Sequence, residues 1–348
     1  MNVQHRRVMM RTLVWCVFIA LVLPLIPYAW SSLENGAVPN PGTQLWRDVR
    51  QRDGAIVGST QVSGVDAGVL ISVYGERWRH YRMNELVPYG AYAMGGVLAF
   101  IGLYFLVRRR MRIEGGRSGE KLLRFTLFQR WVHWSTAALF LLLALTGLVL
   151  LYGRFVLIPV LGPEGFGTTA EVCKWTHNIS GPLFIVAITV MFITYLPGNV
   201  PAWHDIKWVF KGGGFFGGHA SAGRYNAGEK AWFWSTCLLG LLLGISGVVL
   251  LDLITVFGQG RDFMEFAHVI HSVISLFLIC FSFGHMYLAT IGMEGALESM
   301  TTGRVDTNWA KAHHDLWYEE EMAKRSNKAQ RPGSRGATGQ VAEPDAGT

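Results

Sequence analysis

Six long apolar stretches dominate this chain and constrain its fold more than any other feature. They span roughly residues 12–30, 88–107, 131–152, 175–196, 231–251 and 266–291. An α-helix needs about 20 consecutive apolar residues to cross the hydrocarbon core of a bilayer. Charged residues make up only 16% of the chain, whereas a soluble protein has about 25%. A soluble protein with buried core helices is therefore disfavoured, and the sequence predicts an all-α integral membrane protein.

The distribution of Lys and Arg predicts how the chain is oriented in the membrane. The loop between the second and third stretches carries eight basic residues: Arg108, Arg109, Arg110, Arg112, Arg117, Lys121, Arg124 and Arg130. Basic residues accumulate on the cytoplasmic side, so we place this loop there, although Arg77, Arg79 and Arg82 precede the second stretch on the opposite side. If all six stretches cross, both termini are cytoplasmic. The net charge of +7 then reflects membrane topology, and no nucleic acid partner is expected.

The first 107 residues have three predicted parts. Residues 1–30 are interpreted as either a signal peptide or a first transmembrane helix, because both begin with basic residues followed by an apolar run. Residues 31–87 form a polar segment expected in the periplasm. Residues 88–107 are predicted to be a transmembrane helix. The localisation that follows is multi-pass in a bacterial inner membrane.

Four of the eleven histidines lie inside apolar stretches: His133, His177, His271 and His285. An ionisable side chain within the membrane is a functional candidate. The predicted orientation places His177 and His271 near the outer side and His133 and His285 near the cytoplasmic side. The four cysteines lie far apart, and no CxxC motif occurs in the sequence. They therefore suggest neither a zinc site, an iron–sulfur cluster nor covalently attached haem. Depth therefore predicts two histidine pairs.

The spacing on the last stretch supports this pairing. His271 and His285 are fourteen residues apart, which is nearly four helical turns, so both rings face one side about 21 Å apart along the axis. Two bis-histidine haems stacked in a four-helix bundle need this arrangement. Two alternatives remain, namely hydrogen-bonded core histidines and a proton relay in a transporter. The later spans contain no deep carboxylate of the kind such a transporter uses.

A glycine-rich loop leads into the fifth stretch and lies at the level of the inner pair. Residues 211–230 read KGGGFFGGHASAGRYNAGEK, and no strand or Walker spacing supports a phosphate loop. Tyr225 and Asn226 offer polar contacts for a quinone headgroup beside His285. The alternative is an ordinary loop in which Asn226 is the N-cap of the following helix.

Several longer motifs carry a resemblance to a known family. They are QRWVHWS around His133, WTHNISGPLF around His177, RYNAGEKAWFW at 224–234, HSVISLFLICFSFGHMYLA from His271, and WAKAHHDLWY at 309–318. Over about 125–322 the chain resembles the gamma subunit, a di-haem cytochrome b556, of respiratory formate dehydrogenases. The fourteen-residue histidine spacing and the RYNAG and WAKxHH segments are the specific parts of this resemblance.

The resemblance implies a ligand set and a role. His133 and His285 match the ligands of the inner haem b, and His177 and His271 match those of the outer haem b. Asn226 matches a residue of the quinone pocket. The implied function is electron transfer from an iron–sulfur beta subunit through both haems to menaquinone or ubiquinone. Formate oxidation itself then belongs to a molybdenum or tungsten alpha subunit.

The resemblance leaves two questions open. The first 125 residues or so have no counterpart in four-span members, so we expect a four-helix di-haem cytochrome b domain at 125–295, preceded by one or two extra transmembrane helices. A cytoplasmic tail is expected at 296–348, disordered from about 323. The cytochrome b subunits of nickel–iron hydrogenase and thiosulfate reductase are alternatives with the same bundle, and a haem-free membrane anchor or transporter is an alternative of another class.

Overall fold

The computed structural model describes residues 73–214, 220–251 and 261–330. The first predicted apolar stretch, most of the predicted periplasmic segment and residues 331–348 lie outside these ranges. Below, "inner end" denotes the end of the bundle that carries the arginine-rich loop 108–130, following the predicted orientation.

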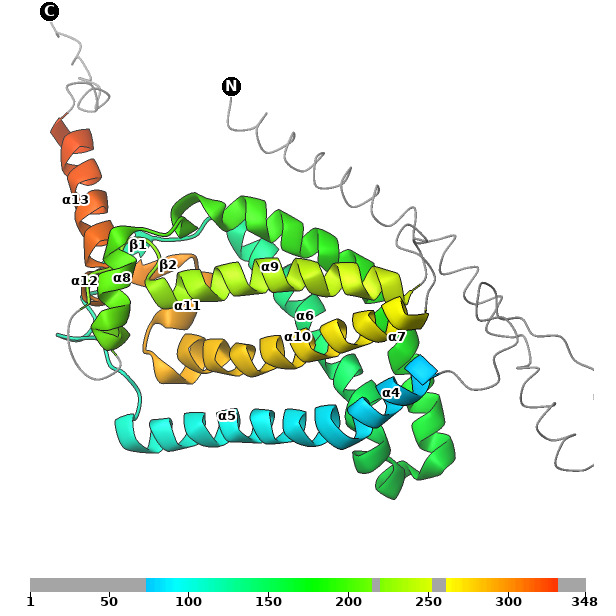
Figure 1. Ribbon diagram of the computed structural model, residues 1–348. Helices are drawn as coiled ribbons and strands as arrows, with labels where there is room; N and C mark the ends of the chain where they lie inside the picture. The colour runs from blue at the N-terminus through cyan, green and yellow to red at the C-terminus, as the bar shows by residue number, and fades with distance from the viewer. Residues whose placement is uncertain (1–72, 215–219, 252–260, 331–348) are drawn as a thin grey trace, which may run out of the picture.

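Four long helices form the centre of the molecule. They are α6 (Leu127–Val156), α7 (Ile158–Asn199), α9 (Ala227–Leu250) and α10 (Arg261–Tyr287). Neighbouring helices pack along most of their length, α6 on α7, α7 on α9 and α9 on α10 (Figure 1). Together with a helix that precedes them, they are the five helices in the described residues that are long and apolar enough to cross a membrane. The predicted all-α membrane bundle is therefore confirmed.

Helices α6 and α9 both begin with a capping box. Thr126 and Asn226 are the N-caps, and each side chain accepts a hydrogen bond from the backbone N–H of the third helical residue. The side chains of the third residues, Gln129 and Glu229, in turn accept a hydrogen bond from the backbone N–H of the cap residue. Such capping boxes satisfy N–H groups that a helix start leaves unpaired. They fix both helix starts at the inner end.

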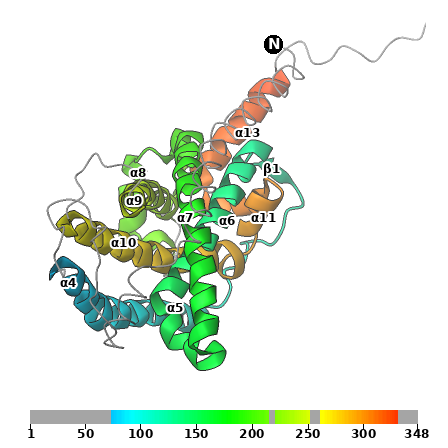
Figure 2. The ribbon, with the colours of Figure 1, turned by 90° about the vertical axis from the view of Figure 1, so that its right-hand side faces the viewer.

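An additional arm lies against α10. It consists of α4 (Val73–Tyr81), a π-helical turn (Arg82–Leu86) and α5 (Val87–Arg108). Figures 1 and 2 show α5 running beside α10, on the side away from α9. The closest approach is at Gly90, where an added Cβ would lie 2.6 Å from the hydroxyl of Tyr152 and 2.7 Å from Cδ1 of Leu276. A larger residue at this crossing would therefore require the side chains of Tyr152 and Leu276 to shift.

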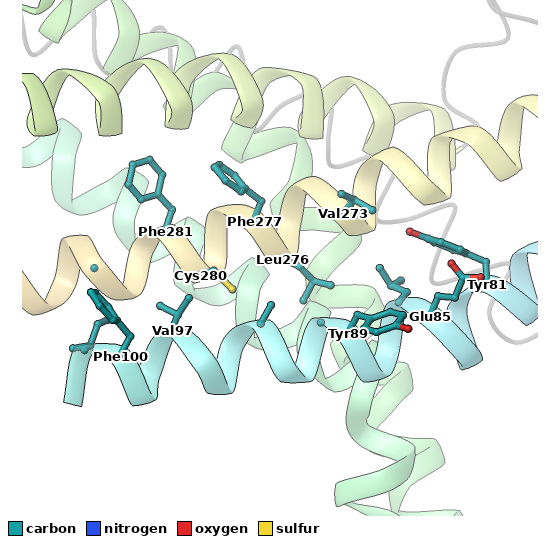
Figure 3. A pocket seen from close by; sticks show the side chains of 15 residues that line it. Tyr81, Glu85, Tyr89, Val97, Phe100, Val273, Leu276, Phe277, Cys280 and Phe281 are labelled. Atoms are coloured by element: carbon teal, nitrogen blue, oxygen red, sulfur yellow. The ribbon is translucent and has the colours of Figure 1, made fainter. Parts of the chain in front are cut away.

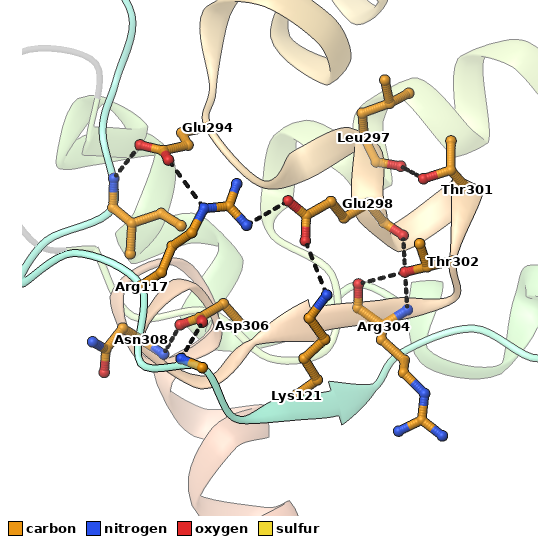
Figure 4. A network of polar contacts seen from close by, with 12 residues as sticks. Arg117, Lys121, Glu294, Leu297, Glu298, Thr301, Thr302, Arg304, Asp306 and Asn308 are labelled. Atoms are coloured by element: carbon orange, nitrogen blue, oxygen red, sulfur yellow. Dashed lines mark hydrogen bonds and ion pairs between the residues drawn. The ribbon is translucent and has the colours of Figure 1, made fainter.

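A polar cap closes the inner end. Its elements are β1 (Lys121–Leu123), α8 (Trp203–Phe210), a 3₁₀ turn (Gly212–Gly214), a second π-helical turn (Leu288–Gly292), α11 (Ala296–Thr301), β2 (Arg304–Asp306), α12 (Thr307–His313) and α13 (Asp315–Gln330). β1 and β2 pair antiparallel, with Leu122 opposite Val305. Arg117 bridges Glu294 and Glu298 across this cap, at 3.3 and 2.6 Å (Figure 4). The loop before α6 and the segment after α10 are thereby joined.

The structure differs from the sequence-based boundaries in two places. α7 begins at Ile158, well before the predicted 175, and contains a non-helical glycine at 162. Helix α13 continues to Gln330, so the expectation of disorder from about 323 is wrong for residues 323–330. These residues form a helix because Ala, Lys, Arg and Gln favour helices and because the start of α13 is packed against α12 and includes the buried Trp317.

Candidate functional site

The two outer histidines face each other across the bundle. His177 lies on α7 and His271 on α10, and their ring centroids are 6.1 Å apart. The two residues are separated by almost a hundred positions in the sequence. Only the packing of the helix bundle brings α7 and α10, and with them the two rings, together. The pair predicted from depth is present in the structure.

A hydroxyl group from a neighbouring helix contacts each outer histidine. Nδ1 of His177 lies 2.9 Å from Oγ1 of Thr146, and Nδ1 of His271 lies 3.0 Å from Oγ of Ser246. Each hydroxyl also donates to a backbone carbonyl of its own helix, at 2.8 and 2.9 Å. The hydroxyl oxygen must then accept its other hydrogen bond from Nδ1–H of the ring. This assignment leaves the Nε2 lone pair of both rings available for a metal.

A glycine follows each of these hydroxyl residues and lies beside the ring. A Cβ added to Gly147 would lie 3.4 Å from Cε1 of His177, and one added to Gly247 would lie 3.2 Å from Cε1 of His271. Because Cε1 adjoins Nε2, a larger side chain would crowd the approach to the free nitrogen. The two glycines therefore leave space where a flat macrocycle can come close to the backbone.

The inner histidines form the second predicted pair. His133 lies near the start of α6 and His285 near the end of α10, with ring centroids 6.3 Å apart. Trp232 of α9 stacks on His285 at a centroid distance of 4.7 Å and an angle of 11°. Nδ1 of His133 is buried and has no hydrogen-bond partner among the described residues. Packing rather than hydroxyl groups therefore orients the inner pair.

Both separations fit an iron held between two imidazoles. A metal–imidazole bond is about 2.0 Å long and the ring centre lies about 1.1 Å beyond the nitrogen, so two opposed imidazole ligands have centroids about 6 Å apart. The observed 6.1 and 6.3 Å agree with this value. Within the described ranges, no three His, Cys, Asp or Glu side chains gather as a structural zinc site requires. Two imidazoles alone suit a metal whose other four ligands come from a macrocycle, as in haem.

A cavity of about 1160 Å³ surrounds the inner pair. Small-molecule sites usually occupy about 300–1,000 Å³, so this cavity has room for a macrocycle and a second ligand. Tyr225 and Asn226 line it together with His133 and His285. The structure thus brings all four sequence-predicted residues of the inner end to one cavity.

Asn226 has a structural role as well. Its Oδ1 accepts a hydrogen bond from the backbone N–H of Glu229 at 2.9 Å, so the N-cap interpretation holds for the carbonyl oxygen. Any hydrogen bond from this side chain to a ligand in the cavity must therefore come from Nδ2. The buried hydroxyl of Tyr225 lies in the wall beside it.

A charged cluster between the cavity and the cap was not predicted from the sequence. Nη2 of Arg124 lies 3.0 Å from both carboxylate oxygens of Glu229, and Nε2 of His314 lies 3.8 Å from one of them. His314 is 1% exposed, and burial, followed by the charge of Arg124, lowers its pKa to about 3. The ring is therefore neutral at physiological pH, and its Nδ1 lies 2.9 Å from the carbonyl of Gly223. The WAKAHHDLWY motif contains His314, but only the folded cap buries it.

Comparison with known proteins gives a consistent family. Residues 124–303, just over half of the chain, match the family described as prokaryotic cytochrome b561. The cytochrome b556(Fdn) subunit of the nitrate-inducible formate dehydrogenase of Escherichia coli (strain K12) is 28% identical over 207 residues, which are 58% of this chain and 92% of that protein.

Two further relatives have similar names. The cytochrome b556(fdo) subunit of formate dehydrogenase from the same strain is 29% identical over 214 residues, or 61% of this chain and 98% of that protein. The cytochrome b556 subunit of formate dehydrogenase from Haemophilus influenzae is 27% identical over 211 residues, with 58% and 84% covered. These relatives confirm the resemblance that the motifs predicted. The chain belongs to the prokaryotic cytochrome b561 family and is a multi-pass membrane cytochrome of the b type that takes part in electron transfer.

Proposed function

We propose that this chain is the membrane cytochrome b subunit of a formate dehydrogenase in a bacterial inner membrane. It holds two b haems, one between His177 and His271 and one between His133 and His285, and it delivers electrons to menaquinone or ubiquinone. Its partners are an iron–sulfur beta subunit and a catalytic alpha subunit that contains molybdenum or tungsten. Formate oxidation takes place in the alpha subunit.

The observation that carries this proposal is that one face of α10 contributes a histidine to each of two imidazole pairs. His271 and His285 both belong to α10, so their rings lie about 21 Å apart along its axis. Each has an opposing ring at a centroid distance near 6 Å. The names of the relatives favour formate dehydrogenase over other complexes.

The chain's own residues supply the environment of the chemistry. When bound, the haems supply one-electron carriers at two depths of the membrane. Thr146 and Ser246 keep the outer rings in the tautomer that can bind iron. At the inner end, Asn226 and Tyr225 line the shared cavity, and in this proposal Nδ2 of Asn226 and the hydroxyl of Tyr225 donate hydrogen bonds to a quinone carbonyl.

The first test is a count of haem in the purified full-length chain. Four ligands, two for each bis-histidine haem, predict about two b haems per polypeptide in a pyridine haemochrome assay. In native membranes, formate should then reduce them. A folded preparation without haem would refute the proposal, and haems that respond to another electron donor but not to formate would refute the assignment to formate dehydrogenase.

A ligand substitution tests the pairing. We expect His271→Ala to remove the outer haem and leave about one b haem per chain. The matched control is His268→Ala, one turn away on α10, where the ring stacks on Trp78 at 4.8 Å. This control should retain both haems. Retention of both haems in His271→Ala would contradict the assigned pair.

A further inference from the structure

A second cavity lies between the additional arm and the bundle. It has a volume of about 760 Å³ and is bounded by the π-helical turn and α5 on one side and by α10 on the other (Figure 3). In Figure 3 the side chains of Val97, Leu276 and Cys280 lie between the two helices. We refer to this cavity as the α5–α10 groove.

The chemistry of the groove suits a hydrocarbon chain. Along most of its length it is lined by aliphatic and aromatic side chains, including Val97, Ile101 and Val273. Its polar side chains are those of Tyr81, Glu85 and Tyr89, which lie together at the outer end. Within a membrane such a groove gains little from excluding lipid, so an occupant must be selected by shape and packing.

The groove and the inner cavity share part of their walls. Phe281 and Gly284 line both, and Gly284 directly precedes His285. An added Cβ on Gly284 would meet nothing within 4 Å, so there is free space at this junction. From Gly284 the groove extends along α10 to Val273, a rise of about 16 Å, which is long enough for several isoprene units.

The groove is an addition to the family bundle. The family match begins at residue 124, whereas one whole wall of the groove comes from residues 81–101. A bundle made only of the matched region would expose this face of α10 to the bilayer. The arm that precedes the matched region therefore adds a second wall beside this face of α10, and the groove between them adjoins the inner cavity.

We propose that the α5–α10 groove holds the isoprenoid tail of the quinone whose headgroup occupies the inner cavity. This inference rests on the proposed function, because it assumes that quinone reacts beside His285. The wall that the two cavities share at Gly284, with the free space beside it, favours this occupant over a phospholipid.

The test is a matched pair of substitutions on α5 in the intact complex in native membranes. Ala93 lines the groove and Ala99 does not, although both are exposed on the same helix. Ala93→Phe places a ring in the groove, and Ala99→Phe places the same ring toward lipid. Quinone reduction is measured with a long-tailed quinone and with a tail-less headgroup analogue.

We expect Ala93→Phe to raise KM for the long-tailed quinone about fivefold and to leave KM for the tail-less analogue unchanged. Ala99→Phe should change neither value. If both variants behave alike with the long-tailed quinone, or if Ala93→Phe depletes co-purified phospholipid without altering KM, the proposal is overturned. If no quinone is reduced even by the unaltered complex, the proposed function fails instead.

A second measurement uses the unaltered complex, so its outcome does not depend on whether a variant folds. A quinone that carries a photoreactive diazirine on its tail is irradiated with the unaltered complex, and the crosslinked peptides are identified by mass spectrometry. Crosslinks within residues 81–101 or 273–284 support the proposal. Crosslinks confined to other lipid-facing helices overturn it.

Discussion

At the scale of single residues, hydroxyl groups decide which nitrogen of each outer histidine can bind iron. Thr146 and Ser246 each donate to a backbone carbonyl and accept from Nδ1–H of a histidine. A ring that donates from Nδ1 is a more basic ligand at Nε2. A more basic ligand stabilises ferric over ferrous iron, so these hydroxyls are expected to lower the outer midpoint potential.

We therefore expect Thr146→Val to raise the midpoint potential of the outer haem. Loss of one hydrogen bond is worth about 1 kcal/mol, and for a one-electron couple about 1.4 kcal/mol corresponds to 59 mV, so the increase should be on the order of 40 mV. Redox titration of the visible spectrum measures it. The control is Thr189→Val on α7, where the hydroxyl donates to the carbonyl of Ile185 and contacts no histidine among the described residues. Equal potentials in the two variants would contradict the assigned hydrogen bond.

At the scale of elements, the two helix hairpins build the outer pair in the same way. Thr146 lies 20 residues after the N-cap Thr126, and Ser246 lies 20 residues after the N-cap Asn226. Each hydroxyl then contacts the histidine of the next long helix. The inner pair breaks this symmetry, because the position of α9 that corresponds to His133 is Phe233. On this side the inner cavity is lined by Trp232 and Phe233 of α9 and by its N-cap Asn226.

The helix start at Asn226 permits a test that separates capping from quinone binding. Serine caps a helix as well as asparagine does, but it has no amide donor. We expect Asn226→Ser to retain the melting temperature of the complex and to lower the rate of quinone reduction about tenfold, the factor that corresponds to about 1.4 kcal/mol. Thr126→Ser on α6 is the matched control and should alter neither quantity. An unchanged rate in Asn226→Ser would mean that Asn226 only caps α9.

The packing of α5 against α10 includes a close helix crossing at Gly90. At Gly90 an added Cβ would lie under 3 Å from Tyr152 and Leu276, whereas at Gly95 it would meet nothing within 4 Å. We expect Gly90→Val to destabilise the chain by about 1–3 kcal/mol, the usual range for overpacking. Gly95→Val should have little effect, because the added side chain has free space there. It is a matched control, since the same substitution is made in the same helix. Thermal denaturation in detergent, followed by haem absorbance, measures the difference. Equal melting temperatures would mean that α5 does not pack as described.

At the scale of the whole molecule, the two histidine pairs lie near opposite ends of the bundle. Only the inner pair opens to the cavity with Tyr225 and Asn226. If electrons enter at the outer end and quinone is reduced at the inner end, negative charge crosses the membrane inward. Protons for quinone reduction are then taken from the cytoplasm.

This arrangement predicts that the complex generates a membrane potential. In vesicles with the formate-oxidising face outward, formate and quinone should produce an interior-negative potential, measured with a voltage-sensitive dye. An ionophore that makes the membrane conductive should abolish the potential while quinone reduction continues. Quinone reduction without any potential in sealed vesicles would mean that quinone reacts at the outer end.

The sequence by itself determined the membrane-spanning bundle, the four histidines and their pairing. The spans follow from a local property, because a helix crosses the membrane where an apolar run is long enough. The facing of His271 and His285 follows from a periodic one, because the helical repeat puts both on one side of the helix. It also indicated Tyr225 and Asn226, because they directly precede a span at the depth of His285.

Tertiary structure alone decided which side chains support these residues. Thr146 and Ser246 resemble any hydroxyl in a span until packing sets them beside Nδ1 of a histidine. His314 lies in a polar segment, yet the cap buries it against Glu229. The α5–α10 groove is formed by two helices that are far apart in the sequence and approach closely at Gly90. Such contacts join residues far apart in the chain, and no local pattern encodes them.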